Sequence, residues 1–216
     1  MRKLTISTRE EAGVSEEAVY ALFCQSFQQW TDNGIDAPFL HTTQEEFKKT
    51  IHNAFVYVAT DTETGELVGT HTLQPNRNKN YVRGCFLAIS PHTKHTGIAT
   101  QMLQYEEKRL QEKGIDYILG TTAVNAIWSV KWHLKNGYRI VGYGRSNYNN
   151  QVYATYLFRK QISPSFLWSG PLAPITAGVR FYMSYSINNI CKTSTGKDNL
   201  IGRIARYVFR KNKRNK

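Results

Sequence analysis

The stretch over residues 81–119 constrains the fold more than any other part of the chain. It contains a predicted strand over Tyr81–Ile89, a helix over residues 97–113 and a short apolar strand over residues 115–119. The helix carries its apolar side chains on one side, and Gly114 follows it as a stop signal. A strand, a crossover helix and a second strand in this order predict two parallel strands in one sheet.

The segments on either side of this crossover add antiparallel strands and more helices. Residues 55–59 and 67–73 are predicted strands joined by a turn that contains Gly65, as in a hairpin. Further strands are expected over Leu4–Thr8 and residues 138–144 and 152–159, and helices over residues 14–30, 43–51 and 125–135. The predicted fold class is therefore α/β (α+β), with a mixed, mostly antiparallel sheet of about six or seven strands, helices on both faces and a basic helical C-terminal extension.

The basic residues are concentrated near the C-terminal end of the chain. The formal net charge is +12, but residues 1–159 hold 17 Lys and Arg against 15 Asp and Glu. Residues 160–216 hold 11 Lys and Arg against the single acid Asp198. We therefore predict a near-neutral globular domain over residues 1–159 and a basic extension over residues 160–216.

The N-terminal residues and the cysteines favour a cytoplasmic protein. Residues 7–11 are polar where a signal peptide needs an apolar stretch, and no apolar run reaches the roughly 18–20 residues that span a bilayer. Cys24, Cys85 and Cys191 are widely separated and show no CxxC spacing. We expect no disulfide framework and no metal site, and each cysteine should be a buried or half-buried thiol.

Residues 90–100 join the strand that ends at Ile89 to the helix that begins near Gly97. A helix N-terminus carries unsatisfied N–H groups and about half a positive charge, so it binds phosphate groups without charged side chains. Gly97 would let the backbone approach a ligand closely, Ala99 keeps the first turn uncrowded, and Lys94 adds a cation. On these residues alone, a solvated loop that ends in a helix cap is the better explanation, and the wider context decides between the two.

Three motifs in a fixed order supply that context. The strand ends in Leu87-Ala88-Ile89-Ser90-Pro91, the loop reads Lys94-His95-Thr96-Gly97-Ile98-Ala99, and a later helix ends in His133-Leu134-Lys135-Asn136-Gly137-Tyr138. Over roughly residues 1–159, and most sharply over residues 81–140, the chain resembles the GNAT acetyltransferase superfamily. Two departures stand out: Lys94 replaces the usual Arg or Gln and loses the planar donor geometry, and His133 replaces the usual Tyr.

The resemblance implies an acyl-CoA-dependent N-acyltransferase with acetyl-CoA as co-substrate. Backbone groups at the strand end would pair with the pantetheine arm, and the N–H groups of the loop would hold the pyrophosphate. Asn125 resembles an asparagine that lies near the pantetheine in the family, although it stands one residue further from Gly137 than usual. The implied cofactor-binding residues are Leu87, Ala88, Ile89, Lys94, His95, Thr96, Gly97, Ile98, Ala99, Thr100 and Asn125.

His133 is the candidate catalytic residue. The resemblance implies that this position protonates the leaving thiolate of CoA, and histidine is able to donate a proton. An equally good explanation is a histidine at a helix C-terminus, where the dipole favours a cation. The base that removes the amine proton stays open, either a water chain to solvent or one of the side chains Asp36, His41, His71 and Tyr156.

The acceptor would be a small-molecule amine. Residues 31–42 and 145–151, where the family builds acceptor pockets, are polar and aromatic with few acids. This composition disfavours polyamines and suits a hydroxylated acceptor such as an amino sugar.

Two other classes of function compete with an enzyme. The first is a non-catalytic, acyl-CoA-binding module that docks through its basic tail. The second, a nucleic-acid-binding protein, ranks lowest, because the charge lies in one terminal segment without a zinc, helix-turn-helix or RRM signature. Residues 199–216 contain apolar side chains at helical spacing among Lys and Arg, which predicts peripheral contact with an anionic membrane at its inner face. Packing of this stripe on the chain's own domain is the alternative.

Overall fold

The computed structural model describes residues 3–35, 38–76, 80–93, 96–148, 151–165, 167–168 and 170–191. Its strands are β1 (Leu4–Thr8), β2 (Phe55–Asp61), β3 (Leu67–Pro75), β4 (Tyr81–Ile89), β5 (Tyr117–Ala123), β6 (Arg139–Tyr148) and β7 (Gln151–Gln161). Its α-helices are α1 (Glu16–Asp32), α2 (Gln44–Ile51), α3 (Ile98–Glu112), α4 (Ile127–Lys135) and α5 (Ala173–Cys191), and short 3-10 helices cover Pro38–His41 and Pro91–Thr93.

The seven strands form one sheet in the order β1-β2-β3-β4-β5-β7-β6. The β4–β5 pair is parallel, as the crossover predicts, and the pairs β1–β2, β2–β3, β3–β4 and β6–β7 are antiparallel. The predicted mixed, mostly antiparallel α/β fold is therefore confirmed. The chain divides into two compact units, unit 1 (residues 1–120 and 160–164) and unit 2 (residues 121–159 and 165–216).

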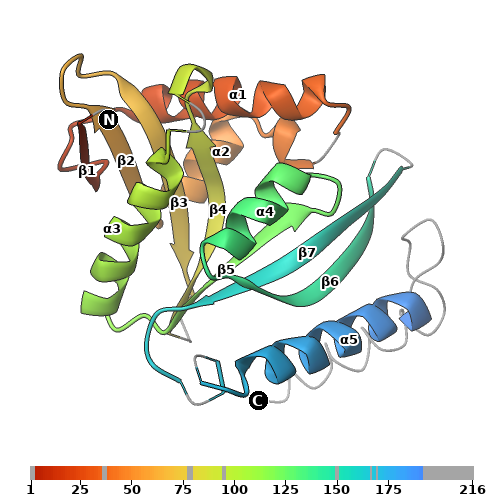
Figure 1. Ribbon diagram of the computed structural model, residues 1–216. Coiled ribbons are helices and arrows are strands. Elements are labelled where there is room, and N and C mark those ends of the chain that lie inside the picture. Colours follow the sequence, from red (N-terminus) through yellow and green to blue (C-terminus); the bar gives the residue numbers. More distant parts are fainter. Residues whose placement is uncertain are drawn as a thin grey trace, which may run out of the picture. The chain divides into compact units, whose positions relative to one another are not determined.

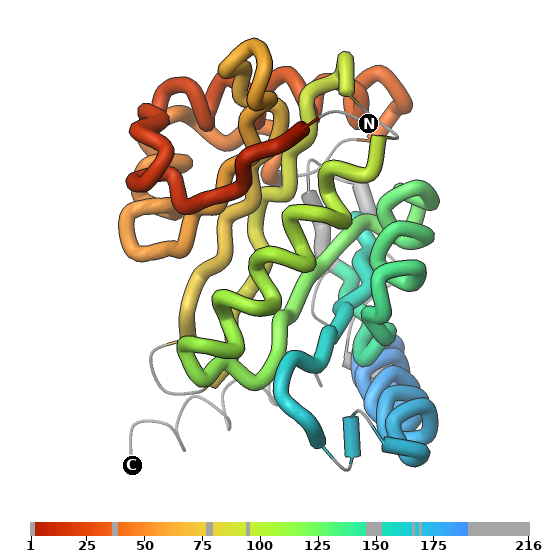
Figure 2. The backbone as a smooth tube through the Cα atoms, turned by 60° about the vertical axis from the view of Figure 1, so that its left-hand side comes forward, coloured from red at the N-terminus to blue at the C-terminus, as the bar shows by residue number. Residues whose placement is uncertain are grey.

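In unit 1, helices cover both faces of the strands (Figures 1 and 2). Side chains of one strand alternate between the two faces. Val56 and Val58 of β2 pack in a cluster with α1 and α2, whereas Tyr57 between them meets Tyr105 of α3 edge to face. Helices α1 and α2 therefore lie on one face and α3 on the other.

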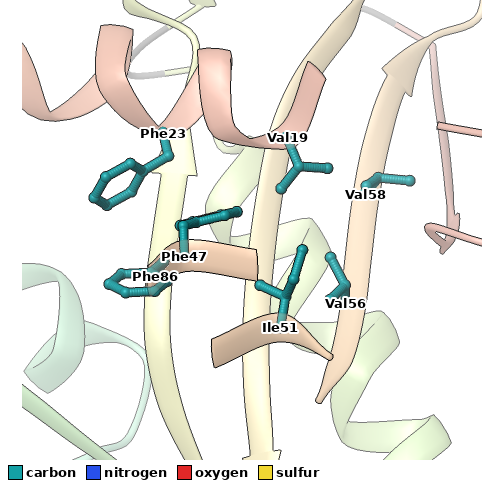
Figure 3. Close-up of a cluster of buried hydrophobic side chains, with 7 residues drawn as sticks. All are labelled: Val19, Phe23, Phe47, Ile51, Val56, Val58 and Phe86. Atoms are coloured by element: carbon teal, nitrogen blue, oxygen red, sulfur yellow. The ribbon is translucent and has the colours of Figure 1, made fainter. Parts of the chain in front are cut away.

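The apolar cluster under α1 and α2 holds unit 1 together (Figure 3). It consists of Val19, Phe23, Phe47, Ile51, Val56, Val58 and Phe86. The ring of Phe86 stacks on Phe47 at 5.2 Å and meets Phe23 at 4.9 Å, edge to face. Burying an apolar side chain of this size stabilises the fold by about 1.5–3 kcal/mol, so these contacts fix α1 and α2 against β2 and β4.

Local capping signals define the starts of α1 and α2. Ser15 Oγ accepts a hydrogen bond from the Ala18 N–H at 3.1 Å, and Thr43 forms a reciprocal capping box with Glu46. Each bond satisfies a first-turn N–H group that has no partner inside the helix. Ser and Thr are favoured N-cap residues, so both caps follow from the local sequence.

Unit 2 contains α4, the β6–β7 hairpin and α5. Ser184 Oγ of α5 accepts a hydrogen bond from the Tyr143 N–H at 2.6 Å, and Asn188 Nδ2 donates to the Tyr143 carbonyl at 2.7 Å. Helix α5 is thus attached to the β6 backbone (Figure 1).

The sequence analysis predicts no helix over residues 173–191, where the structure has α5. Pro174 lies in its first turn, where a helix needs no proline N–H. This helix confirms a helical extension, but Arg180 is its one charged residue. Residues 199–216, to which the predicted membrane contact belongs, lie outside the described residues. The domain boundary at residue 159 and the cytoplasmic location stay predictions.

Two further sequence expectations concern a membrane span and the thiols. No helix within the described ranges is long and apolar enough to cross a bilayer. Cys85 is half-buried, as expected, and burial raises the pKa of its thiol to about 11. The expectation for Cys24 is wrong, because this residue follows the buried Phe23 around α1 and is exposed. The Cys191 side chain is not among those described.

Candidate functional site

Strand β4 contains a bulge that the sequence analysis did not foresee. Leu73 of β3 pairs with Gly84, but His71, two residues earlier, pairs with Leu87, so β4 carries one extra residue between these pairs. Such a bulge bends a strand and is common beside active sites. Gly84 in the interior of a strand is the sequence signal that could have indicated it.

Beyond the bulge, β4 has an edge that β5 does not pair with. The parallel ladder described between the two strands joins Tyr81–Arg83 to Tyr117–Leu119 and then ends. The Ser90 N–H bonds the Val68 carbonyl of β3, so the Ile89 N–H points to the opposite edge, since successive N–H groups alternate. The backbone groups of Leu87, two residues before Ile89, face the same open edge.

One backbone N–H group on the open edge already bonds a side chain of this chain. Ser26 Oγ of α1, which is buried, accepts a hydrogen bond from the Ile89 N–H at 3.0 Å. Of the predicted pantetheine-binding residues, Leu87 and Ile89 are half-buried and Ala88 is buried. Sequence reasoning missed Ser26, because its contact joins residues that are 63 positions apart.

The loop after β4 leads into α3 through Gly97. Lys94 and His95 lie outside the described residues. Thr96 Oγ1 donates to the Thr93 carbonyl at 2.6 Å, which ties the last loop residue to the turn before it. Gly97 is the N-cap of α3 with φ +86° and makes no side-chain cap to the helix.

Two consequences follow for the start of α3. Only glycine adopts this φ value without strain, and the first-turn N–H groups are not satisfied by a side chain of the N-cap residue. Thr96 and Gly97 are exposed, Ala99 and Thr100 are half-buried, and Ile98 anchors the turn in the core. A helix N-terminus of this kind can bind an anion through its backbone N–H groups.

A buried polar pair joins β3 to α3 in unit 1. His71 Nδ1 and Glu106 Oε2 of α3 are 2.8 Å apart, and both side chains are buried. Gly84 makes room for the imidazole, since a Cβ there would lie 3.1 Å from His71 Nε2. Burial and the Glu106 carboxylate raise the pKa of Tyr57 to about 12.

The four candidates for the general base differ in how far their side chains are exposed to solvent. His71 is committed to Glu106 inside the core, His41 is exposed, Tyr156 is half-buried, and Asp36 lies outside the described residues. No base is assigned. In the described part of the chain, no three His, Cys, Asp or Glu side chains gather as a metal site.

In unit 2, His133 lies in the last turn of α4 and is half-buried. Its Nδ1 is 2.8 Å from the Ser129 carbonyl, and its ring stacks on Phe158 at 4.5 Å. A carbonyl only accepts hydrogen bonds, so Nδ1 carries a proton, and Nε2 carries one only in the imidazolium form. Asn125 is exposed, and its carbonyl accepts a hydrogen bond from the Ile127 N–H at 2.9 Å.

Residues 17–138, more than half of the chain, match the model of the acetyltransferase (GNAT) family. No curated protein sequence matches the chain.

Three solved structures illustrate the similarity of fold. The ribosomal-protein-S18-alanine N-acetyltransferase of Escherichia coli is 12% identical with a TM-score of 0.60, over 76% of this chain and 96% of that one. The PaiA N-acetyltransferase of Thermoplasma acidophilum, solved with coenzyme A, is 17% identical with a TM-score of 0.56, over 74% and 99%. The IAA acetyltransferase of Bacillus cereus is 14% identical with a TM-score of 0.55, over 74% and 99%.

Proposed function

The chain belongs to the GNAT acetyltransferase family, and from this premise we propose that it transfers an acetyl group from acetyl-CoA to a primary amine of a small molecule. Family membership supports acetyl transfer to an amine as the general reaction. In the proposed reaction the amine nitrogen attacks the thioester carbonyl, the new C–N bond replaces the C–S bond, the amine loses a proton and the CoA thiolate gains one. The observation that carries the proposal is the glycine N-cap of α3, which makes no side-chain cap, in the same unit as the open edge of β4.

The pyrophosphate of CoA is proposed to bind at residues 94–100. Gly97 contributes a positive φ and no side-chain cap, and the Thr100 N–H donates to the Gly97 carbonyl. The N–H groups of Ile98 and Ala99 are therefore the ones proposed to bind phosphate oxygens. Lys94 and His95 enter the proposal from the family resemblance alone. The exposed Thr96 and Gly97 leave the loop accessible to a ligand.

The pantetheine arm is proposed to pair with β4 at Leu87, Ala88 and Ile89. An extended ligand can add to a strand edge through main-chain hydrogen bonds, and the end of the β5 ladder at Arg83 leaves such an edge. Because Ser26 Oγ already takes the Ile89 N–H, the Ile89 carbonyl is the group expected to meet the ligand. Asn125 enters the proposal from the resemblance alone.

His133 is proposed to donate the proton that the thiolate takes. The Ser129 carbonyl holds the ring through Nδ1, and Phe158 stacks on one face. Nε2 is then the donating atom, and it donates from the imidazolium.

The acceptor is proposed to be a hydroxylated amine such as an amino sugar. The few acids in residues 31–42 and 145–151 support this choice over polyamines. A panel of amino sugars, polyamines and amino acids, assayed for CoA release with acetyl-CoA, tests it. Faster turnover with polyamines than with amino sugars would contradict the acceptor class and leave the reaction class standing.

One observation favours the non-catalytic alternative, an acyl-CoA-binding module. Strand β4, from which some relatives present a glutamate, carries no carboxylate in this chain. The same assay separates the two functions. Binding of acetyl-CoA without transfer to any amine of the panel would favour the module, and transfer would exclude it.

A further inference from the structure

Helix α5 turns its small and polar side toward β6. This inner row consists of Ala173, Ala177, Ser184 and Asn188, of which the alanines are buried and the polar pair bonds the Tyr143 backbone. The spacing of these residues keeps them on one side of a helix of 3.6 residues per turn.

The opposite side of α5 is apolar and exposed. We name it the outer row, and it consists of Ile175, Val179, Tyr182 and Met183, with exposed fractions of 64%, 55%, 71% and 56%. An ordinary surface helix buries its apolar stripe and shows its polar side to water. Helix α5 turns alanines, a polar pair and the rings of Phe181 and Tyr185 toward the hairpin and leaves the outer row exposed. An exposed apolar patch of this kind marks a surface that binds a partner or a membrane.

The charge of unit 2 identifies the chemistry of that environment. The described residues of unit 2 hold six Lys and Arg and no Asp or Glu. A second copy of the chain would bring two strongly positive units together, which like-charge repulsion opposes. A nucleic acid would satisfy the positive charge but offers no apolar depth for four side chains. An anionic lipid surface supplies both the negative charge and the apolar depth.

We infer that the outer row of α5 docks on an anionic membrane surface. The apolar side chains enter the headgroup region, and the basic residues of unit 2 supply attraction to lipid phosphates. This inference goes beyond acetyl transfer. It also differs from the prediction for residues 199–216, because it assigns the apolar contact to α5.

Vesicle flotation of the full chain tests the inference. The wild-type protein should float with vesicles of phosphatidylglycerol and phosphatidylcholine and stay at the bottom with vesicles of phosphatidylcholine alone. The combined variant Ile175→Gln, Val179→Gln and Met183→Gln should bind the anionic vesicles about tenfold more weakly or worse. Glutamine is a good helix former, so circular dichroism should be unchanged.

Two exposed leucines outside the outer row provide the control. Leu134→Gln and Leu167→Gln remove apolar surface of similar exposure from unit 2 and should float as the wild type does. Because the outer row holds none of the proposed site residues, acetyl-CoA binding without vesicles should be the same in the wild type and the combined variant.

Three results would overturn the inference. The first is flotation of the combined variant at the wild-type level. The second is equal recovery of the wild type with both kinds of vesicle, or with neither. The third is a dimer of the wild type in sedimentation velocity that the combined variant fails to form, since the outer row would then be a self-association surface.

Discussion

Unit 1 and unit 2 distribute their apolar and charged side chains in opposite ways. Among the described residues, 20 buried apolar side chains lie in unit 1 and seven in unit 2, and four of those seven are alanines. The large apolar side chains found exposed, from Ile127 to Ile187, belong to unit 2. Unit 1 holds 13 Lys and Arg against 15 Asp and Glu, whereas unit 2 holds 15 against one.

This contrast indicates that unit 1 contributes most of the folding stability and that unit 2 provides a surface for recognition. A unit that buries aromatic and aliphatic side chains supplies most of its own folding free energy. A unit that buries mostly alanines, exposes large apolar side chains and carries almost only positive charge presents a surface suited to partners. Substitutions of similar size should therefore have unequal effects in the two units.

The largest expected effect is on the core of unit 1. Phe47 is fully buried in the cluster of Figure 3, so Phe47→Ala should lower the free energy of unfolding by about 3–5 kcal/mol. In unit 2, Tyr182→Ala removes an aromatic ring that is mostly exposed. This substitution should change the free energy of unfolding by less than about 0.5 kcal/mol. Chemical denaturation followed by fluorescence measures both, and similar losses would erase the contrast.

The next effect is on turnover, through His133 in unit 2. His133→Phe keeps a ring to stack on Phe158 but has no proton to donate, so kcat should fall by about 100-fold or more while acetyl-CoA affinity is unchanged. His133→Tyr restores a donor. A phenol keeps its proton to higher pH than an imidazolium does, so the alkaline fall in kcat should shift to higher pH. A wild-type rate in His133→Phe would leave His133 as a helix-terminal residue only.

A smaller effect is expected for the buried pair of unit 1. Glu106→Ala removes the partner of His71 and should destabilise the protein by about 2 kcal/mol, the cost of an unsatisfied buried polar group. The neighbouring Glu107 pairs with Lys160 at 2.7 Å, but its side chain is partly exposed, so Glu107→Ala should cost less than about 1 kcal/mol. Thermal unfolding of the two variants, measured side by side, compares the losses of stability. Equal decreases in Tm would show that the buried pair stabilises the protein no more than the partly exposed one.

The elements that sequence predicted well depend on local patterns. Strands β1 and β4 have the expected bounds, and the caps at Ser15 and Thr43 follow from residues within a few positions of each other. Gly97 was singled out because a residue without a Cβ lets the backbone approach a ligand at a strand–helix junction, and its positive φ is a finding of the structure.

What the sequence did not predict depends on distant contacts. The bulge in β4 arises from its register with β3, and Ser26 meets Ile89 only once α1 has packed on the sheet. His71 and Glu106 form a pair across 35 positions, which no local pattern encodes. Helix α5 was not predicted over residues 173–191 either, although Pro174 lies in its first turn, where a proline fits a helix.

The central claim, that acetyl-CoA binds at the N-terminus of α3, is tested most directly by titration calorimetry of two glycine variants. Gly97 and Gly114 lie at opposite ends of α3, both with positive φ and with no atom closer than 4.0 Å to an added Cβ. Gly97→Ala and Gly114→Ala therefore introduce similar backbone strain. The account predicts that Gly97→Ala weakens acetyl-CoA binding by about tenfold or more, a loss of about 1.4 kcal/mol, while Gly114→Ala binds as the wild type does. Equal affinity in all three proteins would contradict it.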